Sequence, residues 1–129
     1  MLISSNKDLL FFSKLMLRYE KDIKKKKALG YNIKNKEICK FLKSKEITLD
    51  RKTKPYVHCE KNYIVYTSYE SACVDLIRHI RNAFAHGQIQ IDKNCYLLED
   101  YYKNKLSMYG RINTKYLIEL LDLIFEVSK

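Results

Sequence analysis

The segment from Arg81 to Gly87 carries, within seven positions, the side chains that phosphate chemistry needs. Arg81 supplies a permanent cation, and its guanidinium can grip a phosphate through paired hydrogen bonds and stabilise the charge that develops on it. His86 supplies an imidazole, which titrates near neutral pH and can therefore move a proton. Asn82 adds an amide directly after the arginine. A cation and an imidazole are the minimum equipment for cleaving a phosphodiester without a metal ion.

The order Arg-Asn-x-x-x-His, closed by glycine at the end of an apolar helix, resembles the signature of the HEPN family. HEPN proteins are small and helical, and many are ribonucleases that act as toxins or antiviral defence factors. The resemblance implies a metal-independent endoribonuclease in which the adjacent 2′-hydroxyl attacks the phosphate. It assigns general base or acid catalysis to His86 and phosphate binding to Arg81. Asn82 would orient His86 or donate a hydrogen bond to the phosphate.

A helix over residues 68–86 is predicted to carry this motif. Its apolar residues recur at spacings of three and four and form one face: Tyr69, Cys73, Leu76, Ile77, Ile80 and Phe84. Thr67 and Glu70 have the spacing of a capping box, which would start the helix.

The opposite side of this helix carries polar side chains. Arg78, Asn82 and Ala85 lie opposite the centre of the apolar face, where we expect Arg78 to contact RNA. His79 follows Asp75 by four residues and is expected to form a surface pair with it.

Arg81 and His86 diverge by about 140° on a straight helix, so they cannot hold one phosphate there. Either the helix unwinds before His86, helped by Gly87 as the residue after the cap, or two copies of the motif meet across a dimer. The HEPN resemblance favours the dimer, because HEPN domains commonly pair their motifs in a composite cleft.

Positive charge is concentrated in the first part of the chain. Residues 1–55 contain 16 Lys and Arg against 6 Asp and Glu, whereas residues 56–129 contain 9 of each. A lysine-rich surface attracts phosphate backbones without reading their sequence. The same lysines could instead offset a helix dipole or reflect a lysine-rich composition. The densest run comprises Lys24, Lys25, Lys26 and Lys27.

The remaining elements follow from periodicity and turn residues. Helices are predicted over residues 6–28, over residues 35–44 and from Thr114 onward. Residues 46–66 stay ambiguous, although the run Tyr63-Ile64-Val65-Tyr66 would suit a short strand or an extended lead-in. Two or three short strands are expected between the motif and the last helix, with turns at residues 92–94 and 103–105.

This order predicts a mainly α fold, a HEPN-like helical bundle with a small β-hairpin insertion before the last helix. Its length of 129 residues suits a single domain over residues 1–129. Four tyrosines after the motif could line the same cleft, by stacking on bases or by ordinary packing: Tyr96, Tyr101, Tyr102 and Tyr109.

Cysteine usage and hydropathy narrow the class of protein further. The four cysteines form no Cys-x-x-Cys pair and are expected to be reduced. His58 and Cys59 with Cys39 lack a second ligand pair at zinc spacing, so neither a metal nor a cofactor is expected. No apolar segment approaches membrane-spanning length and no signal peptide is visible, which predicts a cytoplasmic protein without a membrane partner.

Two other classes of function stay open. A non-catalytic HEPN module could hold nucleotide, RNA or a protein partner through the same arginine and histidine. A purely structural helical dimer would explain the apolar faces but not the polar motif. An antitoxin or another regulatory partner is also open. Gln88 stands where HEPN toxins with nucleotidyltransferase antitoxins often carry a tyrosine, so control by modification of that tyrosine is not supported.

Neutralising Lys24, Lys25, Lys26 and Lys27 together should weaken RNA binding and flatten its salt dependence, because fewer counterions are released. The slope of log K against log salt should become shallower by up to about 3 for single-stranded RNA. A salt titration by fluorescence anisotropy measures both quantities. Unchanged binding would show that these lysines reflect the composition of the chain and do not contact RNA.

Overall fold

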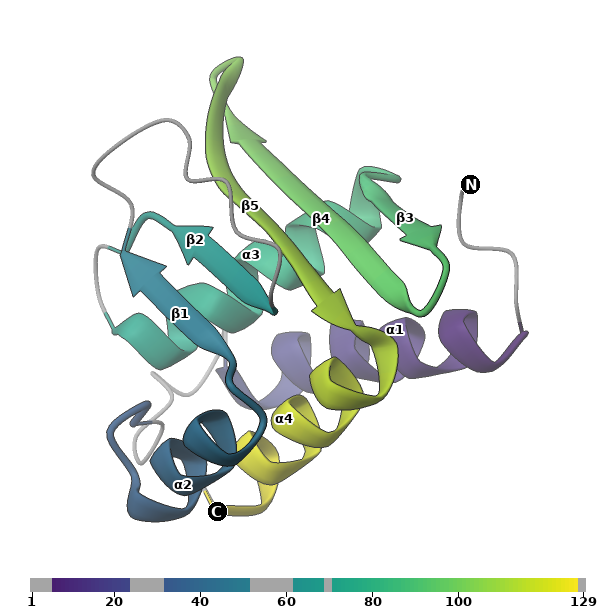
Figure 1. Ribbon diagram of the computed structural model, residues 1–129. Helices are drawn as coiled ribbons and strands as arrows, with labels where there is room; N and C mark the ends of the chain where they lie inside the picture. The colour runs from purple at the N-terminus through teal and green to yellow at the C-terminus, as the bar shows by residue number, and fades with distance from the viewer. Residues whose placement is uncertain (1–5, 24–31, 52–61, 69–70, 128–129) are drawn as a thin grey trace.

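The computed structural model describes residues 6–23, 32–51, 62–68 and 71–127 (Figure 1). Helices and strands follow one another in this order along the chain: α1 (Asn6–Arg18), the π-helical turn η1 (Tyr19–Ile23), α2 (Lys36–Ser44), β1 (Thr48–Arg51), β2 (Tyr63–Tyr66), α3 (Ala72–Ala85), β3 (Ile89–Asp92), β4 (Cys95–Tyr102), β5 (Lys105–Asn113) and α4 (Thr114–Val127).

The five strands form one mixed sheet in the order β1-β2-β5-β4-β3. β1 and β2 pair in parallel, and every other pair of neighbouring strands is antiparallel. Figure 1 shows α3 running behind the sheet, with α1 and α4 close to α3. The core lies between these helices and the sheet, because buried residues of all three helices join buried strand residues in a single cluster.

Strand side chains alternate between the two faces of the sheet, as the pleat requires. The set that faces the helices is almost entirely buried and apolar, and it comprises Ile64, Tyr66, Ile89, Tyr96, Leu98, Met108 and Ile112. The next inward position on β4 after Tyr96 and Leu98 is Asp100. This alternation therefore aims a carboxylate at α3.

The expected mainly α bundle with a small β-hairpin insertion is wrong, because the structure contains a five-stranded mixed sheet with four α-helices. Two features account for the error. The ambiguous segment 46–66 contributes β1 and β2. β2 pairs with β5 and β1 pairs with β2, so the sheet extends beyond a hairpin. The strands after the motif are also long, with eight residues in β4 and nine in β5.

The predicted helices are confirmed within the described residues. α1 and η1 cover residues 6–23 of the expected first helix, α2 starts after an Asn35 cap, and α4 starts at Thr114. The capping box at Thr67 is wrong, because α3 begins at Ala72 and the side chain of Ser71 accepts a hydrogen bond from the Val74 backbone N–H.

The described cysteines, Cys39, Cys73 and Cys95, are free thiols. Burial raises the pKa of Cys73 to about 12, so its thiol stays protonated and packs as a small apolar group. Cys59 and His58 lie outside the described residues. Among those that are described, no three His, Cys, Asp or Glu side chains gather as metal ligands. Nor does any helix in the described part of the chain have the length and apolar character to cross a membrane.

Candidate active site

α3 ends immediately before His86. Gly87, with φ of +67°, reverses the chain so that the Gln88 N–H donates to Ala83 O (2.7 Å) and the Gly87 N–H to Phe84 O (3.1 Å). These two bonds form a Schellman motif, in which glycine tolerates the left-handed conformation best. The predicted role of Gly87 is therefore confirmed, and the side chain of His86 is exposed at the helix end.

Arg81 is held in a fixed direction on the same helix. Its Nη1 donates to the Asn82 Oδ1 (2.8 Å), and its Nη2 donates to the Glu20 Oε1 of η1 (3.0 Å). The guanidinium carbon also lies 5.4 Å from the centre of the Tyr19 ring. Charge-assisted bonds of this kind orient the planar guanidinium and set the direction from which an anion can approach.

Among the described residues, no hydrogen bond or ion pair joins the side chains of Arg81 and His86. His86 is the C-cap of α3, with angles outside the helical region (φ −97°, ψ 10°), whereas the guanidinium of Arg81 is bonded to Glu20 of η1. The side chain of Asn82 binds Arg81, and only the backbone oxygen of Asn82 is bonded to His86, through the His86 N–H (3.0 Å). The described contacts of the two side chains are therefore separate: Arg81 contacts Asn82 and η1, and His86 lies at the exposed helix end.

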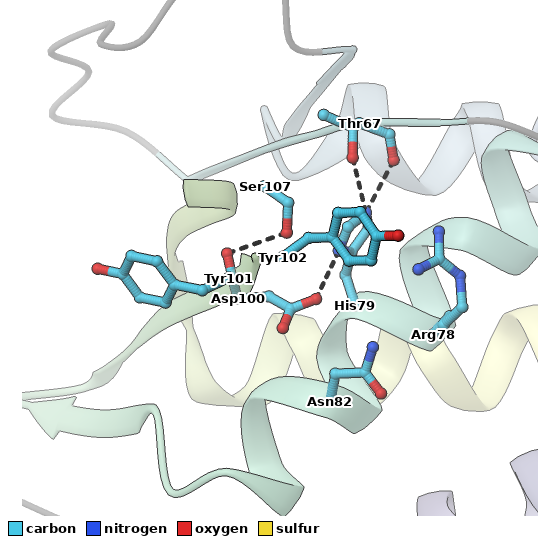
Figure 2. A pocket seen from close by; sticks show the side chains of 8 residues that line it. All are labelled: Thr67, Arg78, His79, Asn82, Asp100, Tyr101, Tyr102 and Ser107. Carbon is cyan, nitrogen blue, oxygen red and sulfur yellow. Dashed lines mark hydrogen bonds and ion pairs between the residues drawn. The ribbon is translucent and has the colours of Figure 1, made fainter. Parts of the chain in front are cut away.

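A pocket of about 440 Å³ opens beside this helix (Figure 2). It lies where α3, the end of β4, the start of β5 and the segment after β2 meet, and its described lining residues are Thr67, Arg78, His79, Asn82, Asp100, Tyr101, Tyr102 and Ser107. The pocket is within the size range of small-molecule sites. It brings together two predicted site residues, Arg78 and Asn82.

His79 is the buried centre of the pocket wall. Its Nδ1 is 2.8 Å from the Asp100 Oδ2 and its Nε2 is 2.8 Å from the backbone oxygen of Thr67. The imidazole thus lies between an oxygen of β4 and a backbone oxygen of the segment after β2. The predicted surface pair with Asp75 is wrong, because His79 is only 1% exposed and is bonded to β4.

A β-bulge shapes this part of the pocket. The register between β4 and β5 shifts after Asp100, where Asp100 pairs with Met108 and Tyr101 pairs with Leu106. Ser107 is the extra residue, and its hydroxyl donates to the backbone oxygen of Asp100 (3.0 Å). Bulges are common beside functional sites, where they redirect side chains.

A sequence profile described as HEPN pEK499 p136 matches residues 1–129. The chain belongs to this HEPN family. No curated protein and no solved structure matches it. The HEPN membership confirms the family that the Arg81-to-Gly87 segment indicated.

Of the residues predicted to contact RNA in this HEPN protein, Arg78 is described by the structure and the lysine run is not. Arg78 lines the pocket with a side chain that is 30% exposed, and its Nη2 donates to the Asp75 Oδ1 (3.0 Å). Asp75 is buried and also accepts a hydrogen bond from the Ser68 hydroxyl (2.9 Å). Lys24, Lys25, Lys26 and Lys27 lie outside the described residues, so their role stays a prediction.

Two of the four tyrosines considered from the sequence reach the pocket. Tyr101 and Tyr102 line it, and both are exposed. Tyr96 is instead a core residue whose hydroxyl donates to Asp8, and burial together with this bond raises its pKa. Tyr109 lines a second hollow of about 550 Å³, which also borders Gly87.

Replacing Asp100 or His79 with alanine should lower the free energy of unfolding by about 3 to 5 kcal/mol, because the partner is left buried without its hydrogen bond. Asp92→Ala is the matched control. Asp92 also lies on the sheet and pairs with Arg111 (3.1 Å), but at the surface, where such pairs contribute about 1 kcal/mol or less. Urea unfolding followed by circular dichroism measures the difference. Equal losses for Asp100→Ala and Asp92→Ala would contradict the assigned role of the buried pair.

Proposed function

We propose that this HEPN protein is a metal-independent endoribonuclease that serves as a toxin or an antiviral defence factor. Arg81 binds the scissile phosphate, and His86 transfers protons as general base or acid. Asn82 fixes the guanidinium of Arg81. The proposal is supported by HEPN membership and by the residue types of the motif.

The observation that carries the proposal is the Arg81–Asn82 hydrogen bond one turn before an exposed His86. A guanidinium that is already oriented stabilises developing charge without having to reorganise during the reaction. An imidazole at an exposed helix end can reach a hydroxyl of a bound chain. Both groups therefore have the setting that their assigned roles need.

The chemistry needs only these groups and the substrate. A base removes the proton of the ribose 2′-hydroxyl, the 2′-oxygen forms a bond to phosphorus, and the bond to the 5′-oxygen breaks. The departing 5′-oxygen takes a proton from the acid, which leaves a 2′,3′-cyclic phosphate and a 5′-hydroxyl. DNA lacks the attacking hydroxyl, so RNA is the proposed substrate.

Binding of the scissile phosphate to Arg81 requires that Glu20 release the guanidinium. The Nη2 of Arg81 donates to the Glu20 carboxylate, so a phosphate that uses the same nitrogen has to replace that carboxylate. The side chain of Glu20 is 40% exposed, and a partly hydrated ion pair of this kind opens at modest cost. RNA binding is thus proposed to exchange one anion for another at Arg81.

The two motif residues act together in a homodimer in this proposal. Arg81 and His86 diverge within one chain, whereas a twofold arrangement can supply the arginine from one protomer and the histidine from its partner. An apolar surface suited to pairing lies on α1, where Leu10 is 56% and Leu17 is 72% exposed. α1 contacts the motif helix through stacked rings of Phe12 and Phe84, with centroids 5.2 Å apart.

Arg81→Ala and His86→Ala should each reduce RNA cleavage by about 10²-fold or more, because each removes a group that acts in the transition state. The assay uses labelled single-stranded RNA with excess chelator, and the product ends are examined for 2′,3′-cyclic phosphate. Arg111→Ala is the matched control, since it removes a partly exposed arginine on the sheet, far from the motif in sequence. It should keep full activity.

Three outcomes would contradict the proposal: cleavage that requires an added divalent cation, full activity of the His86→Ala protein, or products without cyclic phosphate. Binding of RNA without any cleavage would instead identify a non-catalytic HEPN binding module.

A further inference from the structure

We infer that the pocket around Arg78, Asn82 and Tyr102 is a base-binding subsite for single-stranded RNA. It holds one unstacked nucleotide next to the scissile phosphate. The inference rests on the proposed ribonuclease function for its place in the reaction. The binding itself can be tested without any cleavage.

Tyr102 supplies the stacking surface. Alternation along β4 puts Tyr102 on the same face as Asp100, so its ring is on the pocket side, but it stands at the end of the hairpin and stays 63% exposed. Figure 2 shows the Tyr102 ring directed toward Arg78 and the Tyr101 ring directed away from it. An exposed aromatic ring at the mouth of a pocket is the feature on which single-stranded bases stack.

Asn82 connects this pocket to the proposed catalytic arginine. Its Oδ1 accepts the hydrogen bond from Arg81, which leaves the amide nitrogen as its donor for a ligand. In Figure 2 that nitrogen points into the pocket. A base that offers a carbonyl oxygen to Asn82 would therefore be adjacent to the phosphate that Arg81 binds.

The charges of the pocket suit a nucleotide. Arg78 uses only Nη2 on Asp75 among the described residues, so the rest of its guanidinium can bind a phosphate or stack on a base. The Lys103 ammonium lies 5.4 Å from the centre of the Tyr102 ring and adds a second cation. The acid Asp100 is hydrogen-bonded to His79, and Asp75 to Arg78 and Ser68, so neither carboxylate is left uncompensated against an incoming phosphate.

The shape of the pocket favours a single strand. About 440 Å³ is room for one base with its ribose and not for a stacked pair of strands. Sequence-tolerant proteins that bind single strands combine these same two elements, aromatic platforms and cations along the backbone.

The test measures binding of a fluorescein-labelled octanucleotide of 2′-fluorouridine, which the proposed reaction cannot cleave because it lacks the 2′-hydroxyl. Uracil presents two carbonyl oxygens, which match the amide donor of Asn82. Tyr102→Ala should weaken binding by about 5- to 150-fold, the range expected for loss of one base–aromatic stack. Tyr102→Phe, which keeps the ring, should bind within about twofold of the wild-type protein.

Arg111→Ala is the control, because it removes a large, partly exposed side chain of the sheet that does not line the pocket. It should also bind within about twofold of the wild-type protein. A second probe of the same length without bases should bind weakly and show no difference between wild type and Tyr102→Ala. Equal binding of the two probes by the wild-type protein would overturn the inference and leave a phosphate-only surface.

Failure of the subsite and failure of the ribonuclease proposal give different results. If RNA is cleaved but Tyr102→Ala binds like wild type, the subsite is wrong and the ribonuclease proposal stands. If Tyr102→Ala weakens binding but no RNA is cleaved, the base site stands and the ribonuclease proposal is wrong.

Discussion

The contact of His79 with Asp100 and with the backbone of Thr67 is the constraint on which the site depends. It ties α3 to β4 and to the segment after β2 through two bonds of 2.8 Å, which are made by an imidazole that is only 1% exposed. A helix held at one buried polar residue cannot rotate without leaving that residue unsatisfied. This contact fixes the orientation of α3 about its own axis. In that orientation Arg78 and Asn82 line the pocket and Arg81 is directed toward η1.

Asn82 joins the two halves of the proposed function. Its carbonyl oxygen holds Arg81, and its amide nitrogen faces the pocket, so phosphate binding and base binding share one side chain. His86 stands apart from both, at the exposed end of the same helix. This separation is the structural reason for proposing that a second protomer completes the site.

The sequence predicted what depends on local periodicity. The apolar face of α3, the ending of that helix at Gly87 and the opening of α4 at Thr114 each follow from spacing and cap chemistry, and the structure has them. It could not predict contacts across long separations. His79 and Asp100 are 21 residues apart, and their pairing depends on strand alternation and on how α3 crosses the sheet. The short runs that became β1 and β2 carried too few residues to show which strand they would pair with.

Mixing Arg81→Ala chains with His86→Ala chains tests most directly whether RNA is cleaved in a groove shared by two protomers. Random exchange makes about half of the dimers mixed, and each mixed dimer keeps one of its two composite sites intact. The account predicts that the mixture recovers about one quarter of wild-type activity, while either variant alone is inactive. No recovery in a mixture shown to have exchanged subunits, or full wild-type activity in a protein that is monomeric by light scattering, would contradict it.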